Sequence, residues 1–200
     1  LQLQKRAKYL GDRDMFGEMV KGARAQKMSV IARVDPHAMS EEAFAAHPEW
    51  AACTADGKPR RHWAAKDMWV TCQNGGFMFD FMPQVLKEIT DLYKPEGFFG
   101  NRWAGSGMCY CQTCRTKFRA ATGMELPTTN DPQNPQRKAY IQWNADMRWK
   151  QFKLWDDTVK ASKKDCFFSP NGGMNDPNNV TIPIVAVDRQ GRSGTTPVWM

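Results

Sequence analysis

The stretch that decides the fold of this chain is Gly97-Phe98-Phe99-Gly100-Asn101-Arg102-Trp103-Ala104-Gly105-Ser106-Gly107-Met108-Cys109-Tyr110-Cys111-Gln112-Thr113-Cys114. It begins as a short apolar strand, continues as a polar, glycine-rich loop, and ends in three cysteines with the spacing C-x-C-x2-C. In α/β folds, the polar groups that follow a strand are where ligands bind. We therefore expect this stretch to place a functional site.

Helices and strands alternate on both sides of this stretch, which is typical of an α/β fold. Apolar residues recur at helical spacing in some segments, and short apolar runs that end in polar residues indicate strands in others. The longest expected helix should bury Ile141, Met147, Phe152, Trp155 and Val159, and a shorter one should carry Leu92 in its apolar stripe. The expected helices span residues 14–26, 83–93, 115–121 and 137–162, and strands are expected at 28–34, from 97, at 166–169 and at 183–187.

The expected strands all end in polar residues, which favours a (β/α)8 barrel with its active face at the carboxyl ends of the strands. An open doubly wound sheet is the alternative. No G-x-G-x-x-G sequence and no phosphate loop follows a strand, so nucleotide binding has little support. A barrel needs eight strands, and about four are recognisable here. We therefore expect residues 1–200 to form a partial (β/α)8 domain that belongs to a longer chain.

Composition narrows the possible partners. The net charge of +7 is moderate, and the basic residues are dispersed apart from short clusters at Lys58–His62 and Lys160–Lys164, so no nucleic-acid partner is expected. No run of about 18 apolar residues occurs, so neither a transmembrane helix nor a membrane partner is expected. Eight tryptophans, several of them beside polar loop residues, favour a concave site that stacks on ligand rings. A homo-oligomer is left open.

The cysteines form a candidate metal site. Cys109, Cys111 and Cys114 are spaced more like metal thiolates than like disulfide partners. Cys72 is the preferred fourth ligand because it ends the long loop before the helix that leads into the central strand, and Cys53 is the rival. Four thiolates would leave no open position for water, so the expected ion is a structural zinc. Three reduced thiols without metal are the alternative.

A set of motifs in a fixed order gives the chain a family resemblance. The set comprises His47-Pro48-Glu49-Trp50, Asp56-Gly57-Lys58-Pro59, Cys72, the stretch from Gly97 to Cys114, and the strand from Phe167 that opens into Gly173. In this order the chain resembles glycoside hydrolases of the family 42 β-galactosidase type. It is even more similar to the related barrel group of hypothetical glycosyl hydrolases.

The resemblance implies a (β/α)8 barrel that hydrolyses O-glycosidic bonds, with β-galactosides as candidate substrates and a zinc site comparable to the cysteine site above. In family 42 a glutamate that follows an asparagine at the end of the fourth strand serves as acid/base. The matching pair here is Asn101-Arg102, and an arginine does not release its proton near neutral pH. The nucleophile of that family lies on a strand that we do not find in this chain.

The remaining carboxylates at strand ends, Asp35 and Asp188, are the catalytic candidates. The alternatives are a turn-forming aspartate at Asp35 and a salt bridge of Asp188 with a neighbouring arginine. Hydrogen-bonding groups and stacking rings nearby are candidates for sugar binding, with core packing as the alternative for the tryptophans and a surface or core role for the histidines. These substrate-binding candidates are His37, His62, Trp63, Asn101, Arg102, Trp103, Asn171 and Arg189.

Three functions are compared. The first is a glycoside hydrolase that acts on a carbohydrate substrate. The second is a carbohydrate-binding barrel without catalysis, which agrees with Arg102 at the position of the family's glutamate. The third is a zinc-stabilised nucleic-acid-binding module, which would need a contiguous basic face that the dispersed charges do not indicate. The hydrolase is preferred, and two carboxylates facing one pocket would support it.

Overall fold

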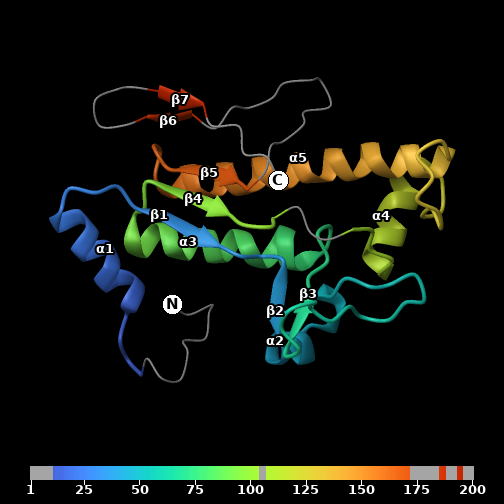
Figure 1. Cartoon of the computed structure of the whole chain (residues 1–200), viewed down its shortest axis with the longest axis horizontal. Coiled ribbons are helices and arrows are strands. Elements are labelled where there is room, and N and C mark those ends of the chain that lie inside the picture. Colours follow the sequence, from blue (N-terminus) through green and yellow to red (C-terminus); the bar gives the residue numbers. More distant parts are fainter. Residues whose placement is uncertain (1–10, 104–106, 172–184, 188–192, 196–200) are drawn as a thin grey trace.

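The computed structural model describes residues 11–103, 107–171, 185–187 and 193–195 (Figure 1). Strands and helices alternate along most of the chain, as the sequence predicted. The elements in chain order are α1 (Met15–Ala25), β1 (Ile31–Val34), β2 (Ala38–Ser40), α2 (Glu41–Ala46), η2 (Pro48–Trp50), β3 (Met68–Val70), η3 (Phe77–Phe81), α3 (Met82–Tyr93), β4 (Gly97–Gly100), α4 (Gln112–Thr122), α5 (Pro135–Ser162), β5 (Phe167–Pro170), β6 (Val185–Val187) and β7 (Ser193–Thr195).

Three of the strands form one parallel sheet in the order β1-β4-β5. The register is even across the sheet: Ala32 pairs with Phe98, and Phe98 pairs with Phe168. The three carboxyl ends therefore lie at one edge, with Val34, Gly100 and Pro170 as paired last residues. This confirms an α/β fold with a parallel sheet.

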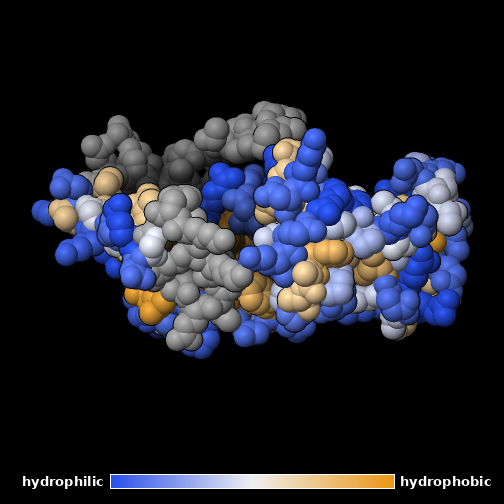
Figure 2. Space-filling model, turned by 90° about the horizontal axis from the view of Figure 1, so that it is seen from below, coloured by the Kyte–Doolittle hydropathy of each residue, from blue (hydrophilic) through white to orange (hydrophobic). Residues whose placement is uncertain are grey.

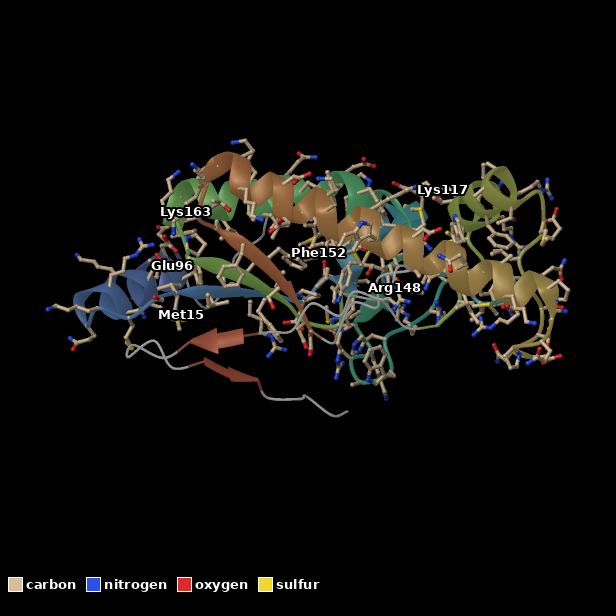
Figure 3. All side chains as sticks on the ribbon, turned by 90° about the horizontal axis from the view of Figure 1, so that it is seen from above. Met15, Glu96, Lys117, Arg148, Phe152 and Lys163 are labelled. Atoms are coloured by element: carbon tan, nitrogen blue, oxygen red, sulfur yellow. The ribbon has the colours of Figure 1, made fainter. Side chains whose placement is uncertain are left out.

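Helices α3 and α5 lie side by side on one face of this sheet (Figures 1 and 3). The core between them and the sheet includes Phe98, Phe168 and Trp155, which are at most 3% exposed. The Trp155 indole donates a hydrogen bond of 2.8 Å to the Met78 carbonyl, so its polar atom is satisfied inside the core. Burial of these aromatic rings stabilises the helix layer.

Local signals explain where the helices begin. Asp14 caps α1 by accepting a hydrogen bond from the Gly17 N–H, and Asn134 caps α5 by accepting from the Arg137 N–H. Pro135 then occupies the first turn of α5, where its missing N–H costs nothing. Helix α5 is 28 residues long.

No helix within the described ranges is both long and apolar enough to cross a bilayer.

Two residues that were expected to be buried, one on α5 and one on α3, are exposed to solvent. Ile141 is 48% exposed and Leu92 is 58% exposed, so neither belongs to the core. Helix α5 instead buries Tyr140 and Trp143 in that region, because α4 packs there. Figure 2 shows one face of the molecule, on which hydrophilic residues predominate and hydrophobic residues emerge in smaller areas.

Two antiparallel pairs were not predicted. Strand β2 pairs with β3, which lies in the segment expected to be a long loop. Strand β6 falls within the expected strand at 183–187, but it pairs antiparallel with β7 and does not join the β1-β4-β5 sheet among the described residues. The structure therefore confirms a strand in this segment and, among the residues it describes, does not show it in the parallel sheet that a barrel layout requires. Periodicity identifies a strand but not its partner.

An ion pair joins elements at the amino ends of the strands. Glu96 accepts a hydrogen bond of 2.7 Å from the Val30 N–H, and the ammonium of Lys163 lies 3.2 Å from the other carboxylate oxygen (Figure 3). These contacts connect the starts of β1 and β4 to the end of α5. The polar groups at this end of the sheet are therefore paired with one another.

The close approach of β4 and β5 gives a matched pair of test substitutions. A Cβ atom at Gly100 would overlap the ring of Phe168, which is 3% exposed and enclosed by the core. We expect Gly100→Ala to lower the free energy of unfolding by about 2 kcal/mol, as overpacked cores do. At Gly97 the added atom would meet Phe167, which is 42% exposed and has room to turn away, so Gly97→Ala should cost less than about 1 kcal/mol. Urea denaturation of both variants measures this difference, and equal losses would contradict it.

Candidate active site and metal centre

Three polar side chains form a hydrogen-bonded row across the carboxyl ends of the sheet. The Asn101 amide donates to Asp35, and the Asn171 amide donates to the Asn101 carbonyl oxygen at 2.7 Å. Backbone hydrogen bonds hold the row in place, because the Asn101 N–H bonds to Val34 and the Asn171 N–H bonds to Gly100. The structure thus brings together three residues that the sequence had placed at separate strand ends.

The carboxylate of Asp35 is ionised at neutral pH. Burial opposes its ionisation, but hydrogen bonds from Arg33 at 2.8 Å and from Asn101 outweigh it and hold the pKa of Asp35 below its usual range. An ionised carboxylate accepts hydrogen bonds from sugar hydroxyls and can act as a base or a nucleophile. It has no proton to give, so Asp35 in this environment is not a general acid.

His37 and His62 adopt defined tautomers. His62 Nδ1 accepts from the N–H groups of Ala64 and Ala65, both at 3.1 Å, so its proton lies on Nε2. That Nε2 lies 3.2 Å from His37 Nε2, which therefore accepts, and His37 carries its own proton on Nδ1. Nδ1 of His37 is buried without a hydrogen-bond partner among the described residues and lies 3.9 Å from Asp35.

The two sequence-predicted tryptophans have different environments. Trp63 is 58% exposed, stacks on His62 at 4.0 Å, and has the Arg102 guanidinium 4.9 Å from its ring centre. Arg102 itself has a φ of 50°, in the left-handed region that strains a residue with a side chain. Trp103 is only 2% exposed and packs on Phe168, so its ring offers no free face to a ligand. Trp103 is therefore a core residue in the structure, as the alternative interpretation of its role had it.

Asp188 and Arg189 lie outside the described residues. The separation of the Asp35 and Asp188 carboxylates is therefore not defined, and their pairing in one site stays a prediction. Sequence reasoning missed Arg33, which holds Asp35 by a charged hydrogen bond. Alternation along β1 could have found it, because residues two apart on a strand point to the same face.

Four buried cysteines form the second candidate site. The sulfur atoms of Cys72, Cys109, Cys111 and Cys114 all lie within 4.8 Å of one another, so the structure assembles the predicted ligand set. Sulfur atoms around a tetrahedral zinc lie about 3.8 Å apart, given a Zn–S distance of about 2.3 Å. The Cys72 sulfur lies 3.5 Å from that of Cys114 and 3.4 Å from that of Cys111. The cluster therefore has the size and donor set of a metal-thiolate site.

Polar donors point at these sulfur atoms. Cys109 Sγ accepts from the backbone N–H groups of Cys53 at 3.3 Å and Cys111 at 3.5 Å, and the Asn74 amide lies 3.6 Å from Cys114 Sγ. Donors of this kind stabilise negative charge on sulfur, as metal-bound thiolates need. The Cys53 thiol instead faces the Ala51 carbonyl oxygen at 3.8 Å, so the rival ligand lies outside the cluster.

Helix α4 contributes to the position of the cluster. Cys114 is in its first turn, and Lys117, one turn later, donates a hydrogen bond of 2.8 Å to the Asn74 carbonyl oxygen (Figure 3). The Tyr110 N–H bonds to the Cys53 carbonyl oxygen at 3.0 Å and ties the segment after β4 to the segment before β3. The four cysteines thus join two parts of the chain that are far apart in sequence.

The α/β fold places the polar row at the edge of a parallel sheet where such folds bind ligands. A family model with the description "hypothetical glycosyl hydrolase 6" matches residues 1–102, just over half of the 200 residues. The chain is therefore a member of the hypothetical glycosyl hydrolase 6 family. Likeness to family 42 stays a resemblance. Among curated proteins, none matches the chain significantly.

Solved structures of glycosidases share the fold. The α-L-fucosidase isoenzyme 2 from Paenibacillus thiaminolyticus matches 80% of the chain with a TM-score of 0.62 at 20% identity. A polyextremophilic β-galactosidase from the Antarctic haloarchaeon Halorubrum lacusprofundi matches 80% with a TM-score of 0.63 at 16% identity. The chain spans only 23% and 29% of these two proteins, respectively. At such identities the likeness shows the fold alone.

The environment of His37 predicts a pH-dependent stability. Burial, followed by the positive charge of Arg102, lowers the pKa of His37, and its other facing groups are Asp35, His62 and Arg33. The unfolded chain therefore binds the proton more readily, so this stability is present above about pH 6.5 and is lost as the pH falls through that value. We expect the urea midpoint to fall between about pH 7.5 and about pH 5.5, and His37→Gln to reduce that fall.

His47→Gln is the control for this experiment, because the His47 side chain is exposed and contacts the nearby Glu49 and Trp50 rather than Asp35, Arg102 or His62. It should leave the pH dependence of the urea midpoint as it is in the parent protein. A pH dependence that is the same in the His37→Gln variant as in the parent would contradict the assignment to His37.

Proposed function

We propose that the chain forms one side of a (β/α)8 barrel that hydrolyses glycosides. The sheet face opposite α3 and α5 supports the barrel, because Ile31 is 47% and Phe167 is 42% exposed there. Strands β1 and β5 are edges of the sheet among the described residues, and edges of parallel sheets are normally paired or covered. Further parallel strands would cover this face and pair with both edges.

The row Asp35–Asn101–Asn171 is the observation that carries the proposed sugar site. It combines an ionised acceptor with two amides at the carboxyl edge of a parallel sheet, where such folds bind ligands. Sugar hydroxyls both donate and accept, so a charged acceptor beside amides suits them. Trp63 offers an exposed ring beside His62 on which a sugar ring could stack.

Catalysis needs two groups in this proposal. Asp35 is ionised and serves as base or nucleophile, and Asp188 is the proposed partner that supplies the proton to the leaving group. Arg102 binds and orients the substrate, together with Arg189, His37 and the amides of the row. β-Galactosides are the first substrates to test, because the resemblance to family 42 includes Asn101.

A sugar-binding barrel without catalysis is the second candidate. The observation that favours it is the pairing of Asp35 with Arg33 at 2.8 Å, which neutralises the carboxylate and weakens it as a base or nucleophile. Arg102, which stands where family 42 has its acid/base glutamate, also favours a barrel without catalysis. In that case the same row would bind sugar without turnover.

We further propose that the four cysteines hold a structural zinc ion. All four ligands would come from the protein, so the metal would have no open position for water or substrate. When bound, the ion would cross-link the segment after β3 to the segment after β4. Its role would be to fix these segments, and the sugar chemistry would lie with the row at the strand ends.

Substitution of Asp35 tests the proposed hydrolysis. We expect Asp35→Asn in the full-length protein to lower kcat/KM for a nitrophenyl glycoside by about 10²- to 10⁴-fold, the usual loss for a base or nucleophile. Nitrophenyl β-galactoside and α-L-fucoside are assayed in parallel. Asp91→Asn is the control, because Asp91 is exposed on α3 and pairs with Lys87 there.

Each result of this assay separates the two candidate functions. Turnover by the parent that is lost in Asp35→Asn supports the hydrolase. Binding of galactose or fucose without turnover by the parent supports the non-catalytic barrel. Full activity in the Asp35→Asn variant would contradict the role of Asp35.

Metal analysis tests the zinc proposal. Purified protein should contain about one zinc ion per chain, and Cys72→Ser should reduce this content to nearly none, because three thiolates hold structural zinc poorly. Cys53→Ser is the matched control, since the Cys53 thiol lies outside the cluster, and it should keep the full zinc content. A Cys72→Ser variant that keeps its zinc, measured by plasma mass spectrometry, would contradict the ligand set.

A further inference from the structure

A pocket beside α5 has a lining that the proposed sugar site does not explain. Its volume is about 340 Å³, which is the size of a small-molecule site. Five of its lining residues follow one stripe of α5, and the others come from the segments after β3 and β4. The lining includes Gln73, Met108, Arg137, Tyr140, Asn144 and Arg148.

The polar groups that line this pocket are mostly hydrogen-bond donors. Arg137 and Arg148 bring two guanidinium groups, and none of the lining residues is acidic. Within the described part of the chain, no ion pair joins either arginine to a carboxylate. Two positive charges without a balancing carboxylate make the pocket suited to an anion.

Two donor atoms in the pocket are buried and unsatisfied. Gln73 is only 8% exposed, and its Nε2 has no hydrogen-bond partner among the described residues; the same holds for Nη1 of Arg137. A buried donor without a partner is costly, and such groups usually have a ligand or an ordered water to satisfy them. An oxyanion in the pocket would accept from both donors.

The pocket lies at the same end of the sheet as the proposed sugar site. Phe152 packs against β5, with its ring 6.1 Å from that of Phe168. Arg148 is one helical turn earlier on α5, about 6 Å along the helix axis. Figure 3 shows it further toward the carboxyl ends of the strands than Phe152. The segment that carries Asn101 and Arg102 continues to Met108 in the pocket wall. The row and the pocket therefore lie at the same end of the sheet.

We propose that this pocket binds an oxyanion carried by the saccharide substrate, such as a carboxylate on the sugar. That the ligand is a saccharide rests on the proposed function. That it carries a negative charge rests on the two arginines and the unsatisfied donors of the pocket. The Arg148 guanidinium binds the anion from α5, and the Gln73 amide donates to it from the opposite wall. The pocket would thereby select acidic saccharides over neutral ones of the same shape.

The test is calorimetric titration of the full-length protein with galacturonic acid, galactose and sodium sulfate. Galacturonic acid should bind about tenfold more tightly than galactose, since a charge-assisted hydrogen bond contributes about this factor. Arg148→Gln should abolish the preference. Arg119→Gln is the matched control. It removes the same charge from α4, where Arg119 is exposed and pairs with Glu125, and it should leave the preference for galacturonic acid unchanged.

A second variant excludes a purely structural role. Gln73→Met keeps the side-chain length and removes a donor that has no partner in the protein, so the melting temperature should not fall. The preference for galacturonic acid should nevertheless fall several-fold. A fall in melting temperature with an unchanged preference would assign Gln73 to packing and overturn its role in the pocket.

The outcomes separate this inference from the proposed function. Equal affinity for galacturonic acid and galactose, or a preference that survives Arg148→Gln, would overturn the oxyanion pocket and leave the sugar site intact. Sulfate that binds as tightly as galacturonic acid would overturn the saccharide as the carrier of the anion. If neither sugar binds, and sulfate binding still depends on Arg148, the proposed function fails and the ligand is an inorganic oxyanion.

Discussion

The pairing of β4 with a parallel strand on each side is the constraint on which the rest of the structure depends. Because β1 and β5 both hydrogen-bond to β4 in even register, their carboxyl ends are level. This brings Asp35, Asn101 and Asn171 within hydrogen-bond reach, although they are 66 and 70 residues apart in sequence. The small residues Gly97 and Gly100 allow the phenylalanine rings of β5 to lie against β4.

The charge at the strand ends explains why a site there is chemically specific. Arg33 and Asn101 hold Asp35 ionised, whereas burial and Arg102 keep His37 neutral. A charged acceptor and a neutral imidazole whose Nδ1 lies 3.9 Å from it therefore occur together at neutral pH. Neither group is a strong acid there, so a hydrolase built on this edge must obtain its acid from another segment.

The features that the sequence predicted are local ones. Most helices and strands are set by residues close in sequence, and the structure has α1, α3, α4, α5, β1, β4 and β5 in the segments where the sequence predicted them. The cysteine cluster was also predicted, because metal ligands have recognisable spacing. The contact of His37 with His62 and the burial of Tyr140 in place of Ile141 were missed. Both depend on which distant element packs alongside, and a single sequence does not encode that in its spacing.

The pocket beside α5 is attached to the cysteine cluster through residues that adjoin in sequence. Gln73 directly follows Cys72, and Met108 directly precedes Cys109, so two walls of the pocket beside α5 are attached to metal-site residues. Helix α5 supplies the remaining wall and packs against α4, which carries Cys114. Cross-linking the cysteines would thus hold Gln73 and Met108 at a fixed distance from the arginines of α5. A metal ion held by the four cysteines would in this way define the shape of the pocket beside α5.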